Sequence, residues 1–484
     1  MKKIIPSFIA GVMVTVLMIS SVTYATGNNN LIEVILNNIN VAVNGEIVVE
    51  VGQNYETSSG EKVPYSILYK GTTYLPIQKV SEILGKEVKW DGTTKTANIK
   101  DLIENNSVQK DINKDENINN KDYQIHAYYA IKSYEQYKSM LTDSSLLDID
   151  TVGFGWSNMV YNTESEQVIL QTDKDGDFHI PEGYKEPYSI FKNSNKPSLL
   201  NIYADGRDLS DILKNKDKAI ESIVSEIDNN KNGLNFDGVI INFEELESFD
   251  SELFNDFLVA LKDKLSDMDK LLYVTVMPNT YGYGYDYRAI GDVADKVILM
   301  AHDYDVNTLS DQVTIKGIVK NPIAPYNLVE NAILDIVDKE KGVQDPNKIL
   351  LQISFGTSQW QVKDDYLYNG YQSGEIKADH PTYNMIYNRL KKEISEGKVA
   401  SDVIFFENES KSPYIKYYNE DNQTDNYIWY EDQRSVSSKI DLVKKYNLGG
   451  ISIWRIGAIP NYKDIDNNEI YLNLWNEAIK KIKE

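Results

Sequence analysis

The sequence predicts an α/β protein: a TIM (β/α)8 barrel with a small α+β insertion before its last strand, preceded by a small α+β N-terminal domain. Beyond Tyr123, short apolar runs alternate with amphipathic helical stretches, which is the pattern of a parallel sheet. Eight such units in roughly 250 to 400 residues match the size of an elaborated barrel. Residues 31–101 differ, because apolar and polar residues alternate there in short runs, as in hairpins.

The chain begins with the features of an export signal. Met1–Lys3 is basic, Ile4–Val22 is apolar, and Thr23–Ala25 offers small residues at both positions that define a cleavage site. We therefore expect residues 1–25 to be a signal peptide, and the protein to be secreted or held at the cell surface or cell wall. The apolar run approaches the length of a membrane span, so an uncleaved anchor stays an alternative.

Residues 31–101 carry the signals of a small α+β domain. Turn signals at Asn44–Gly45 and Asp91–Gly92 each separate two short alternating runs, which predicts two hairpins. Between the hairpins, the apolar stripe of Val80–Leu84 predicts a short helix that ends at Gly85.

Three segments of this domain resemble the copper amine oxidase N-terminal-like stalk domain of bacterial surface proteins: Tyr69–Pro76, Ser81–Gly85 and Val88–Asp91. The resemblance implies a spacer or wall-proximal module. No His or Cys lies within it, so we expect no copper. Residues 102–121 are mostly Asn, Asp, Lys, Glu and Ser, a composition that predicts a polar linker and leaves residues 122–484 for the barrel.

Eight apolar runs beyond the linker are the predicted barrel strands. They are Ile125–Ala130, Ile149–Gly155, Ser198–Tyr203, Phe236–Phe243, Leu272–Met277, Lys296–Ala301, Ile349–Phe355 and Gly450–Trp454. Amphipathic stretches such as Ala219–Asp228 and Leu253–Leu265 predict the covering helices. The interval before the last strand is long and holds strand-like runs at Val403–Phe406 and Tyr427–Tyr430, so we expect the inserted subdomain there.

Composition narrows the classes of function. Lys and Arg number 50 against 73 Asp and Glu, a net charge of −23 that repels phosphate backbones, so we expect no nucleic-acid partner. The chain has no Cys, which excludes thiol nucleophiles and disulfides, and only four His, so we expect neither a metal nor a cofactor. The 34 Tyr and 6 Trp suit stacking on sugars, although Tyr also packs in ordinary cores.

The most informative strand ends at Glu244. Side chains alternate along a strand, so Ile240, Asn242 and Glu244 share the face that points into a barrel. Glu244 is the last of them and lies at the carboxyl-terminal mouth, where barrel active sites are found. Burial among rings would raise its pKa, as a general acid requires. A capping or salt-bridged Glu at a strand end stays an equal alternative on this geometry alone.

The stretch Asp237–Glu244 resembles the Asp-Gly-x-x-x-Asp-x-Glu active-site motif of glycoside hydrolase family 18, the chitinases and their relatives. Met300–Asp303 is similar to that family's sixth-strand Met-x-Tyr-Asp, and Gly450–Gly457 to its eighth-strand segment with a sugar-binding Trp. Further segments resemble the spore-cortex-lytic and cell-wall branch: Tyr285–Gly291, Pro325, Trp429–Asp432 and Ser435–Lys439.

The resemblance implies an enzyme that cleaves β-1,4 bonds of N-acetylglucosamine-containing polymers, such as peptidoglycan or chitin, by substrate-assisted retaining hydrolysis. Glu244 would donate the proton, and Asn242 would orient the substrate's own 2-acetamido group, whose carbonyl acts as the nucleophile. Five residues would bind substrate: Asp237, Met300, His302, Asp303 and Trp454. The stalk domain would associate the enzyme with the cell wall or a spore layer.

Three residues depart from the family pattern. Asn242 replaces the usual Asp and removes a negative charge beside the developing cation, Ile240 replaces an acidic or amide residue, and His302 stands where Tyr is usual. These changes keep a second hypothesis open, a non-catalytic glycan-binding barrel carried on a stalk. Trp156 and Trp360 each follow a barrel strand, and either could stack on sugar or pack in the core.

Overall fold

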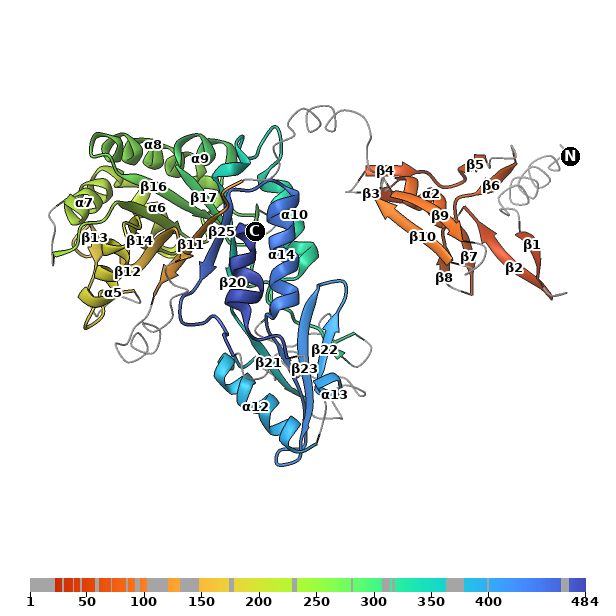
Figure 1. Ribbon diagram of the computed structural model, residues 1–484. Coiled ribbons are helices and arrows are strands. Elements are labelled where there is room, and N and C mark those ends of the chain that lie inside the picture. Colours follow the sequence, from red (N-terminus) through yellow and green to blue (C-terminus); the bar gives the residue numbers. More distant parts are fainter. Residues whose placement is uncertain are drawn as a thin grey trace, which may run out of the picture. The chain divides into compact units, whose positions relative to one another are not determined.

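The chain divides into two compact units, residues 1–120 and 121–484, which are described separately (Figure 1). The computed structural model describes residues 22–27, 30–37, 39–43, 46–56, 61–70, 72–83, 86–91, 96–101, 121–130, 148–173, 178–228, 233–279, 282–306, 314–315, 318–362, 378–397, 400–462 and 470–484. Most of the predicted signal peptide and nearly all of the predicted linker lie outside these ranges. Within them, no helix has the length and apolar character needed to cross a membrane.

The described residues of the first unit form a set of short antiparallel strands with one helix. β1 (Val22–Gly27), β2 (Asn30–Leu36), β7 (Ile67–Tyr69) and β8 (Thr72–Tyr74) form a four-stranded sheet, followed by α2 (Ile77–Ile83). Three two-stranded hairpins complete it: β3 (Val41–Val43) with β4 (Glu46–Val49), β5 (Asn54–Glu56) with β6 (Lys62–Pro64), and β9 (Lys86–Asp91) with β10 (Thr96–Asp101). Both predicted hairpins and the helix between them are confirmed, while the predicted turn residues Asn44, Gly45 and Gly92 and the predicted helix end at Gly85 lie outside the described residues.

The second unit is a closed parallel barrel. Its eight parallel strands are β11 (Gln124–Tyr129), β12 (Thr151–Asn162), β14 (Ser198–Ala204), β15 (Gly238–Phe243), β16 (Leu271–Val276), β17 (Lys296–Leu299), β20 (Ile349–Ser354) and β25 (Gly450–Trp454). Pairing of β11 with both β25 and β12 closes the ring, and β13 (Gln167–Gln171) adds an antiparallel edge to β12. All eight predicted strands are confirmed, with ends that shift by a few residues.

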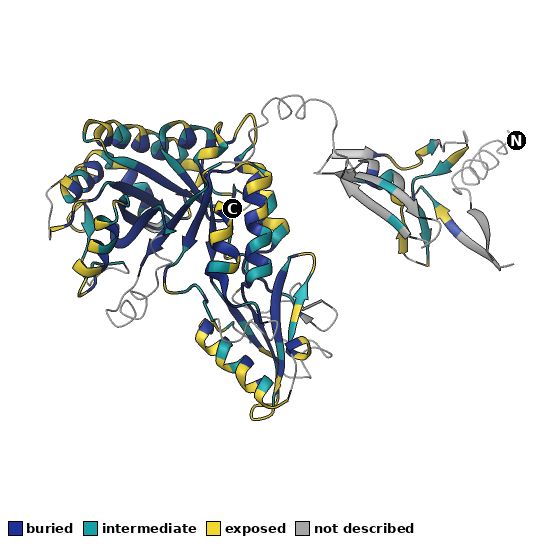
Figure 2. Cartoon of the chain, viewed as in Figure 1, coloured by how far each residue is buried: buried dark blue, intermediate teal, exposed yellow. Residues whose placement is uncertain are grey.

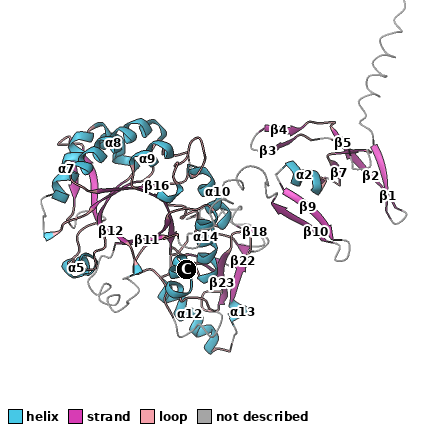
Figure 3. Ribbon diagram, turned by 45° about the horizontal axis from the view of Figure 1, so that its top comes forward, coloured by secondary structure: helices cyan, strands magenta, loops and turns pink. Residues whose placement is uncertain are grey.

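Helices cover the outside of the barrel, as the ring of cyan helices around magenta strands shows (Figure 3). They are α5 (Lys185–Asn193), α6 (Gly206–Lys214), α7 (Lys216–Asp228), α8 (Ser251–Asp267), α9 (Tyr287–Val293), α10 (Tyr326–Ile336) and α14 (Gln433–Lys445). Their inner faces and the strands are buried, while their outer faces are exposed (Figure 2).

β15 shows why this sequence forms a barrel strand. Val239 and Phe243 belong to the outer core, where the Phe243 ring stacks 5.5 Å from that of Phe257 on α8. Ile240 points the opposite way and packs with Tyr273 and other inward residues of neighbouring strands. Both faces are therefore apolar, and replacing the fully buried Phe243 with Ala would cost about 3 to 5 kcal/mol.

The insertion before the last barrel strand is an α+β subdomain, as predicted. Its antiparallel strands follow the order β21 (Ser358–Val362), β24 (Thr424–Trp429), β23 (Ser412–Asn419) and β22 (Ile404–Glu407). α12 (Tyr383–Ser395) and α13 (Ala400–Val403) complete it. Trp360 is fully buried with Trp429 in a core on one sheet face, and Trp156 is fully buried in the main core, so both pack internally and neither binds sugar.

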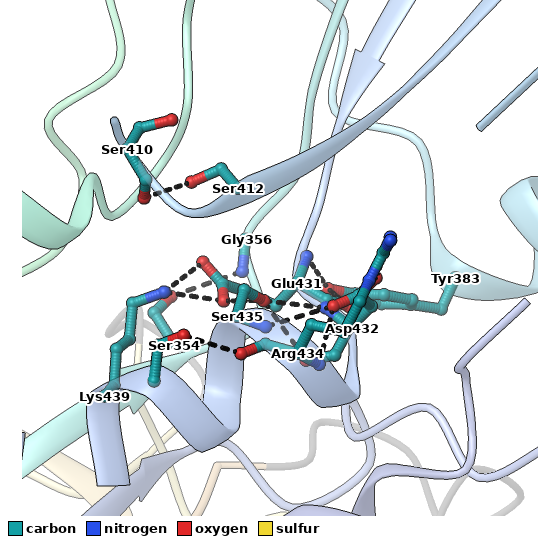
Figure 4. A network of polar contacts seen from close by, with 11 residues as sticks. Ser354, Gly356, Tyr383, Ser410, Ser412, Glu431, Asp432, Arg434, Ser435 and Lys439 are labelled. Atoms are coloured by element: carbon teal, nitrogen blue, oxygen red, sulfur yellow. Dashed lines mark hydrogen bonds and ion pairs between the residues drawn. The ribbon is translucent and has the colours of Figure 1, made fainter. Parts of the chain in front are cut away.

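A buried polar network anchors this insertion to α14 (Figure 4). The Lys439 ammonium lies 2.7 Å from a Glu431 carboxylate oxygen, and both side chains are at most 3% exposed. Ser435 Oγ donates to the same carboxylate, and the Tyr383 hydroxyl of α12 accepts the Glu431 backbone N–H. Asp432 caps α14 by accepting the backbone N–H groups of its first turn. The segments around Glu431 and Lys439 that resemble the cortex-lytic branch thus have a structural role.

Candidate active site

Glu244 lies at the carboxyl-terminal mouth of the barrel. It follows β15 directly, and its backbone N–H donates to Ala204 O at 2.9 Å, which extends the strand pairing by one residue. A cavity of about 720 Å³ opens there. It is lined by Tyr128, Phe178, Tyr203, Asn242, Glu244, Glu245, Met277, Tyr283, Met300, His302, Asp303, Tyr304, Asp305, Val306, Gln352, Trp454 and Arg455.

Asn242 and Glu244 form a fixed pair inside this cavity. Asn242 Nδ2 donates to Glu244 Oε1 at 3.0 Å. Asn242 Oδ1 accepts the hydroxyl of Thr275, on β16, at 2.6 Å. Thr275 is fully buried, so the Asn242 amide is held between it and Glu244. The amide therefore holds the carboxyl group toward the cavity in one orientation.

Burial raises the pKa of Glu244. The hydrogen bond from Asn242 and the positive field of His302 oppose that rise, whereas the negative charges of Asp303 and Glu245 add to it. Desolvation is the largest of these effects, and the pKa ends above the ordinary value. A carboxyl group in this state keeps a proton to higher pH and can act as a general acid.

His302 and Asp303 form a second pair across the cavity. His302 Nδ1 lies 2.9 Å from Asp303 Oδ2, and its Nε2 lies 2.5 Å from Gln352 Oε1. Burial lowers the pKa of His302, but Asp303, Gln352 and Glu244 together outweigh it and raise the pKa overall. The same pair lowers the pKa of Asp303, against the effect of burial. With both ring nitrogens facing oxygens, the imidazolium form is favoured.

Trp454 forms an aromatic wall with residues from other strands. Its ring lies edge-on to Tyr128, with centroids 5.2 Å apart, and edge-on to Phe178, at 6.3 Å. Phe178 in turn contacts Tyr203, with centroids 5.2 Å apart. Met300 lies on the same cavity. An apolar wall facing polar groups is the arrangement that a sugar ring requires.

Asp237, which the sequence predicted to bind substrate, does not line this cavity. It precedes β15, at the opposite end of the strand from Glu244. Both of its carboxylate oxygens lie 2.7 Å from Lys192 Nζ on α5, and one accepts the Ser198 backbone N–H. Seven residues of strand span about 23 Å, which is too far for both ends to reach one cavity. Asp237 instead joins a helix to the start of two strands.

The family follows from a match over most of the chain. The family model for glycosyl hydrolases family 18 matches residues 124–458. The chain belongs to glycosyl hydrolase family 18. A second model, that of the copper amine oxidase N-terminal domain, matches residues 52–135. This match begins and ends later than residues 31–101, over which the sequence predicted the stalk domain.

Several known proteins are similar to this family 18 chain. The cortical fragment-lytic enzyme of Bacillus subtilis is 24% identical over 259 residues, 52% of this chain and 53% of that protein. The corresponding enzyme of Bacillus anthracis is 25% identical over 222 residues, 44% and 45% of the two chains. The chain thus spans about half the length of the curated relatives it matches.

Two solved structures share the fold. The spore cortex-lytic enzyme SleL of Bacillus megaterium QM B1551 superposes with a TM-score of 0.54 at 20% identity, covering 76% of this chain and 75% of that one. A chitinase from Chromobacterium violaceum ATCC 12472 superposes with a TM-score of 0.54 at 18% identity, covering 75% and 100%.

The family 18 barrel of this chain brings six of the seven predicted site residues onto one cavity. These are Asn242, Glu244, Met300, His302, Asp303 and Trp454. Sequence analysis missed several others on it: Tyr128, Phe178, Tyr203, Gln352 and Arg455. Tyr128, Tyr203 and Gln352 lie on barrel strands, where inward alternation could have indicated them. Phe178 lies beyond the end of β13, and nothing in its local sequence indicates the cavity.

The described residues contain no group of three or more His, Asp or Glu side chains that could hold a metal ion. The charged groups on the cavity are Glu244, Glu245, Asp303, Asp305 and one arginine, with His302 titratable beside them. Burial raises the pKa of Asp305, and the negative charge of Asp303 adds to this rise. The site therefore offers acid–base groups and hydrogen-bond donors to a ligand.

Proposed function

We propose that this chain is a retaining glycosidase that cleaves β-1,4 bonds of an N-acetylglucosamine-containing polymer, with peptidoglycan as its substrate. The observation that carries the proposal is the buried Glu244, whose pKa is raised and which a fixed amide holds toward the cavity. Membership of family 18 supports the reaction class. Relatives named cortical fragment-lytic enzymes support a wall polymer as the substrate.

In the first step, Glu244 gives its proton to the glycosidic oxygen while the bond from C1 to that oxygen breaks. The carbonyl oxygen of the substrate's 2-acetamido group attacks C1 from the other face and forms an oxazolinium ion. Asn242 supports this step in two ways. Its Nδ2 group donates to the Glu244 carboxyl group and orients it. The acetamido group of the substrate binds next to the Asn242 side chain. No second protein carboxylate is needed as the nucleophile.

In the second step, the Glu244 carboxylate takes a proton from water as the water oxygen bonds to C1. The ring of the oxazolinium ion opens, and the product keeps its original anomeric configuration. Asp303 and His302 face the acetamido side of the cavity, while Trp454 supports the sugar ring. We assign each of these roles because the residue lines the cavity and because membership of family 18 implies that role for it.

The enzyme would act outside the cell membrane. The predicted signal peptide supports export, and the domain that matches the copper amine oxidase N-terminal model would associate the barrel with the wall or a spore layer. Both assignments are testable by locating the full-length chain in cell fractions.

The alternative function is a glycan-binding barrel without turnover. Asn242 favours it, because an amide supplies no negative charge to a developing cation. The deciding experiment incubates the full chain with peptidoglycan strands and measures both binding and new reducing ends. Reducing ends that depend on Glu244 support the enzyme. Binding without reducing ends supports the alternative.

A further inference from the structure

Arg455 is a half-buried cation on the cavity that the proposed reaction does not use. It follows Trp454 at the end of β25, and its Nη1 donates to Ala130 O at 2.8 Å. No carboxylate of the described residues forms an ion pair with it. Burial lowers the pKa of Arg455, and no neighbouring acid offsets this effect. Among the described residues it forms one hydrogen bond, to Ala130 O, which leaves further N–H donors of the guanidinium for a ligand.

Arg455 also lies where two cavities meet. It lines the cavity of Glu244 and a second cavity of about 490 Å³ beside it. Phe355, Tyr383 and Tyr462 give the second cavity aromatic walls, and Asn384 supplies polar atoms. A sugar bound beside Trp454 could thus extend a substituent past Arg455 into this second cavity. An unsubstituted glycan would leave the second cavity unfilled.

The charges of the first cavity restrict where an anion can bind. Glu244, Glu245, Asp303 and Asp305 all line it, and the pKa of Asp303 is lowered by its pairing with His302. A carboxylate on the ligand would be repelled by the anionic part of the cavity and attracted at Arg455. Guanidinium groups bind carboxylates through two parallel hydrogen bonds, which fixes orientation as well as affinity.

We propose that Arg455 binds a carboxylate carried by the glycan, and that the second cavity holds the substituent bearing it. This inference rests on the proposed function and names its substrate more closely. A glycan with lactyl or peptidyl substituents on alternate sugars carries such carboxylates, whereas chitin carries none. Arg455 would therefore determine specificity for peptidoglycan over chitin.

Binding to a protein that cannot turn substrate over tests this inference separately from the proposed function. In the Glu244→Gln background, Kd is measured by calorimetry for chitin oligomers, for peptidoglycan strands stripped of peptides, and for strands with peptides. Adding Arg455→Gln is expected to weaken binding of the carboxylate-bearing strands by about tenfold or more relative to chitin, because charge-assisted hydrogen bonds are lost. Arg455→Lys should retain part of the preference.

Arg288 provides a matched control. It is also half-buried and donates to one backbone carbonyl, that of Lys339, but it lies on α9, outside both cavities. Arg288→Gln also removes one positive charge. It should leave unchanged the ratio of the Kd for chitin oligomers to the Kd for the carboxylate-bearing strands. If Arg455→Gln lowers the affinity for all three ligands equally, or lowers none of them, the inference is overturned even if the enzyme is active.

The two carboxylate sources are distinguished by filling the second cavity. Ala458 lines only that cavity, and its replacement by Trp should weaken binding of peptide-bearing strands while sparing stripped strands. The lactyl carboxyl group is free in stripped strands but amide-bonded to the peptide in peptide-bearing strands, so a loss of affinity confined to stripped strands in the Arg455→Gln protein identifies the lactyl carboxylate as the ligand. If Arg455→Gln weakens binding of both kinds of strand but Ala458→Trp spares both, the substituent that bears the carboxylate lies outside the second cavity. That outcome would overturn the role of the second cavity and keep that of Arg455.

Discussion

The Asn242→Asp variant adds a negative charge to the centre of the site while keeping the shape of the side chain. In the wild-type protein, Asn242 Nδ2 donates to Glu244 Oε1 at 3.0 Å, which favours the ionised carboxylate and partly offsets burial. Aspartate removes this donor and adds repulsion between two carboxylates. Both effects raise the pKa of Glu244, so the variant retains its proton donor to higher pH.

The size of the effect follows from the 3.0 Å separation of the two groups. Two unit charges about 3 Å apart repel by roughly 5 kcal/mol at an effective dielectric constant of about 20. The two groups therefore cannot both ionise near neutral pH and hold one shared proton. Once that proton moves to the leaving group, the pair faces the cation that develops at C1. One electrostatic contact to a charge that develops in the transition state stabilises that state by about 3 to 4 kcal/mol. Desolvation of the carboxylate that Asn242→Asp introduces reduces this stabilisation, so we expect kcat to rise roughly ten- to a hundredfold.

The assay is the pH dependence of kcat and kcat/KM on a chitin oligomer. Wild-type activity should fall as pH rises through the raised pKa of Glu244, and Asn242→Asp should move that fall to higher pH. Thr275→Val is the control, because it removes the hydrogen bond to Asn242 Oδ1 without adding charge. A folded Asn242→Asp protein whose alkaline limb coincides with that of wild type would refute the reasoning.

Two further predictions concern stability. Lys439→Met should lower the free energy of unfolding in urea by about 3 to 5 kcal/mol, because it leaves the Glu431 charge buried without a partner, and adding Glu431→Gln should restore part of the loss; a single-variant loss below 1 kcal/mol would contradict this. Asp237→Asn should cost only about 1 to 2 kcal/mol, because its ion pair with Lys192 is about one-third exposed, and should leave KM for a chitin oligomer unchanged. A raised KM would show that Asp237 contributes to substrate binding.

The barrel strands could be predicted because each is a short apolar run with a clear end, such as Gly450–Trp454, which the structure places at the same residues. The inward position of Glu244 followed from strand alternation alone. The family motif did not reveal the role of Asp237, because the motif runs the length of one strand and includes residues at both of its ends. The bounds of β15 place Asp237 at the far end of the strand, and its pairing with Lys192, 45 positions earlier, shows its contact there.

The partners of the site residues were also beyond local sequence. Gln352, on β20, contacts His302 from 50 positions away, and Thr275 contacts the amide of Asn242 from 33 positions away. Such contacts depend on the register between barrel strands, which one sequence does not specify. Arg455 was part of a recognised segment, but only the packing around β25 shows that no acidic side chain of the described residues pairs with it.

The central claim is that Glu244 gives its proton to a glycosidic bond, and the most direct test counts new reducing ends. Full-length protein is incubated with peptidoglycan strands alongside Glu244→Gln, with Glu245→Gln as a control on the neighbouring carboxyl of the same cavity. We expect wild type to release reducing ends, Glu244→Gln to be slower by about two to four orders of magnitude, and Glu245→Gln to lose far less. Equal rates for wild type and Glu244→Gln, or binding with no release by either, would contradict the claim.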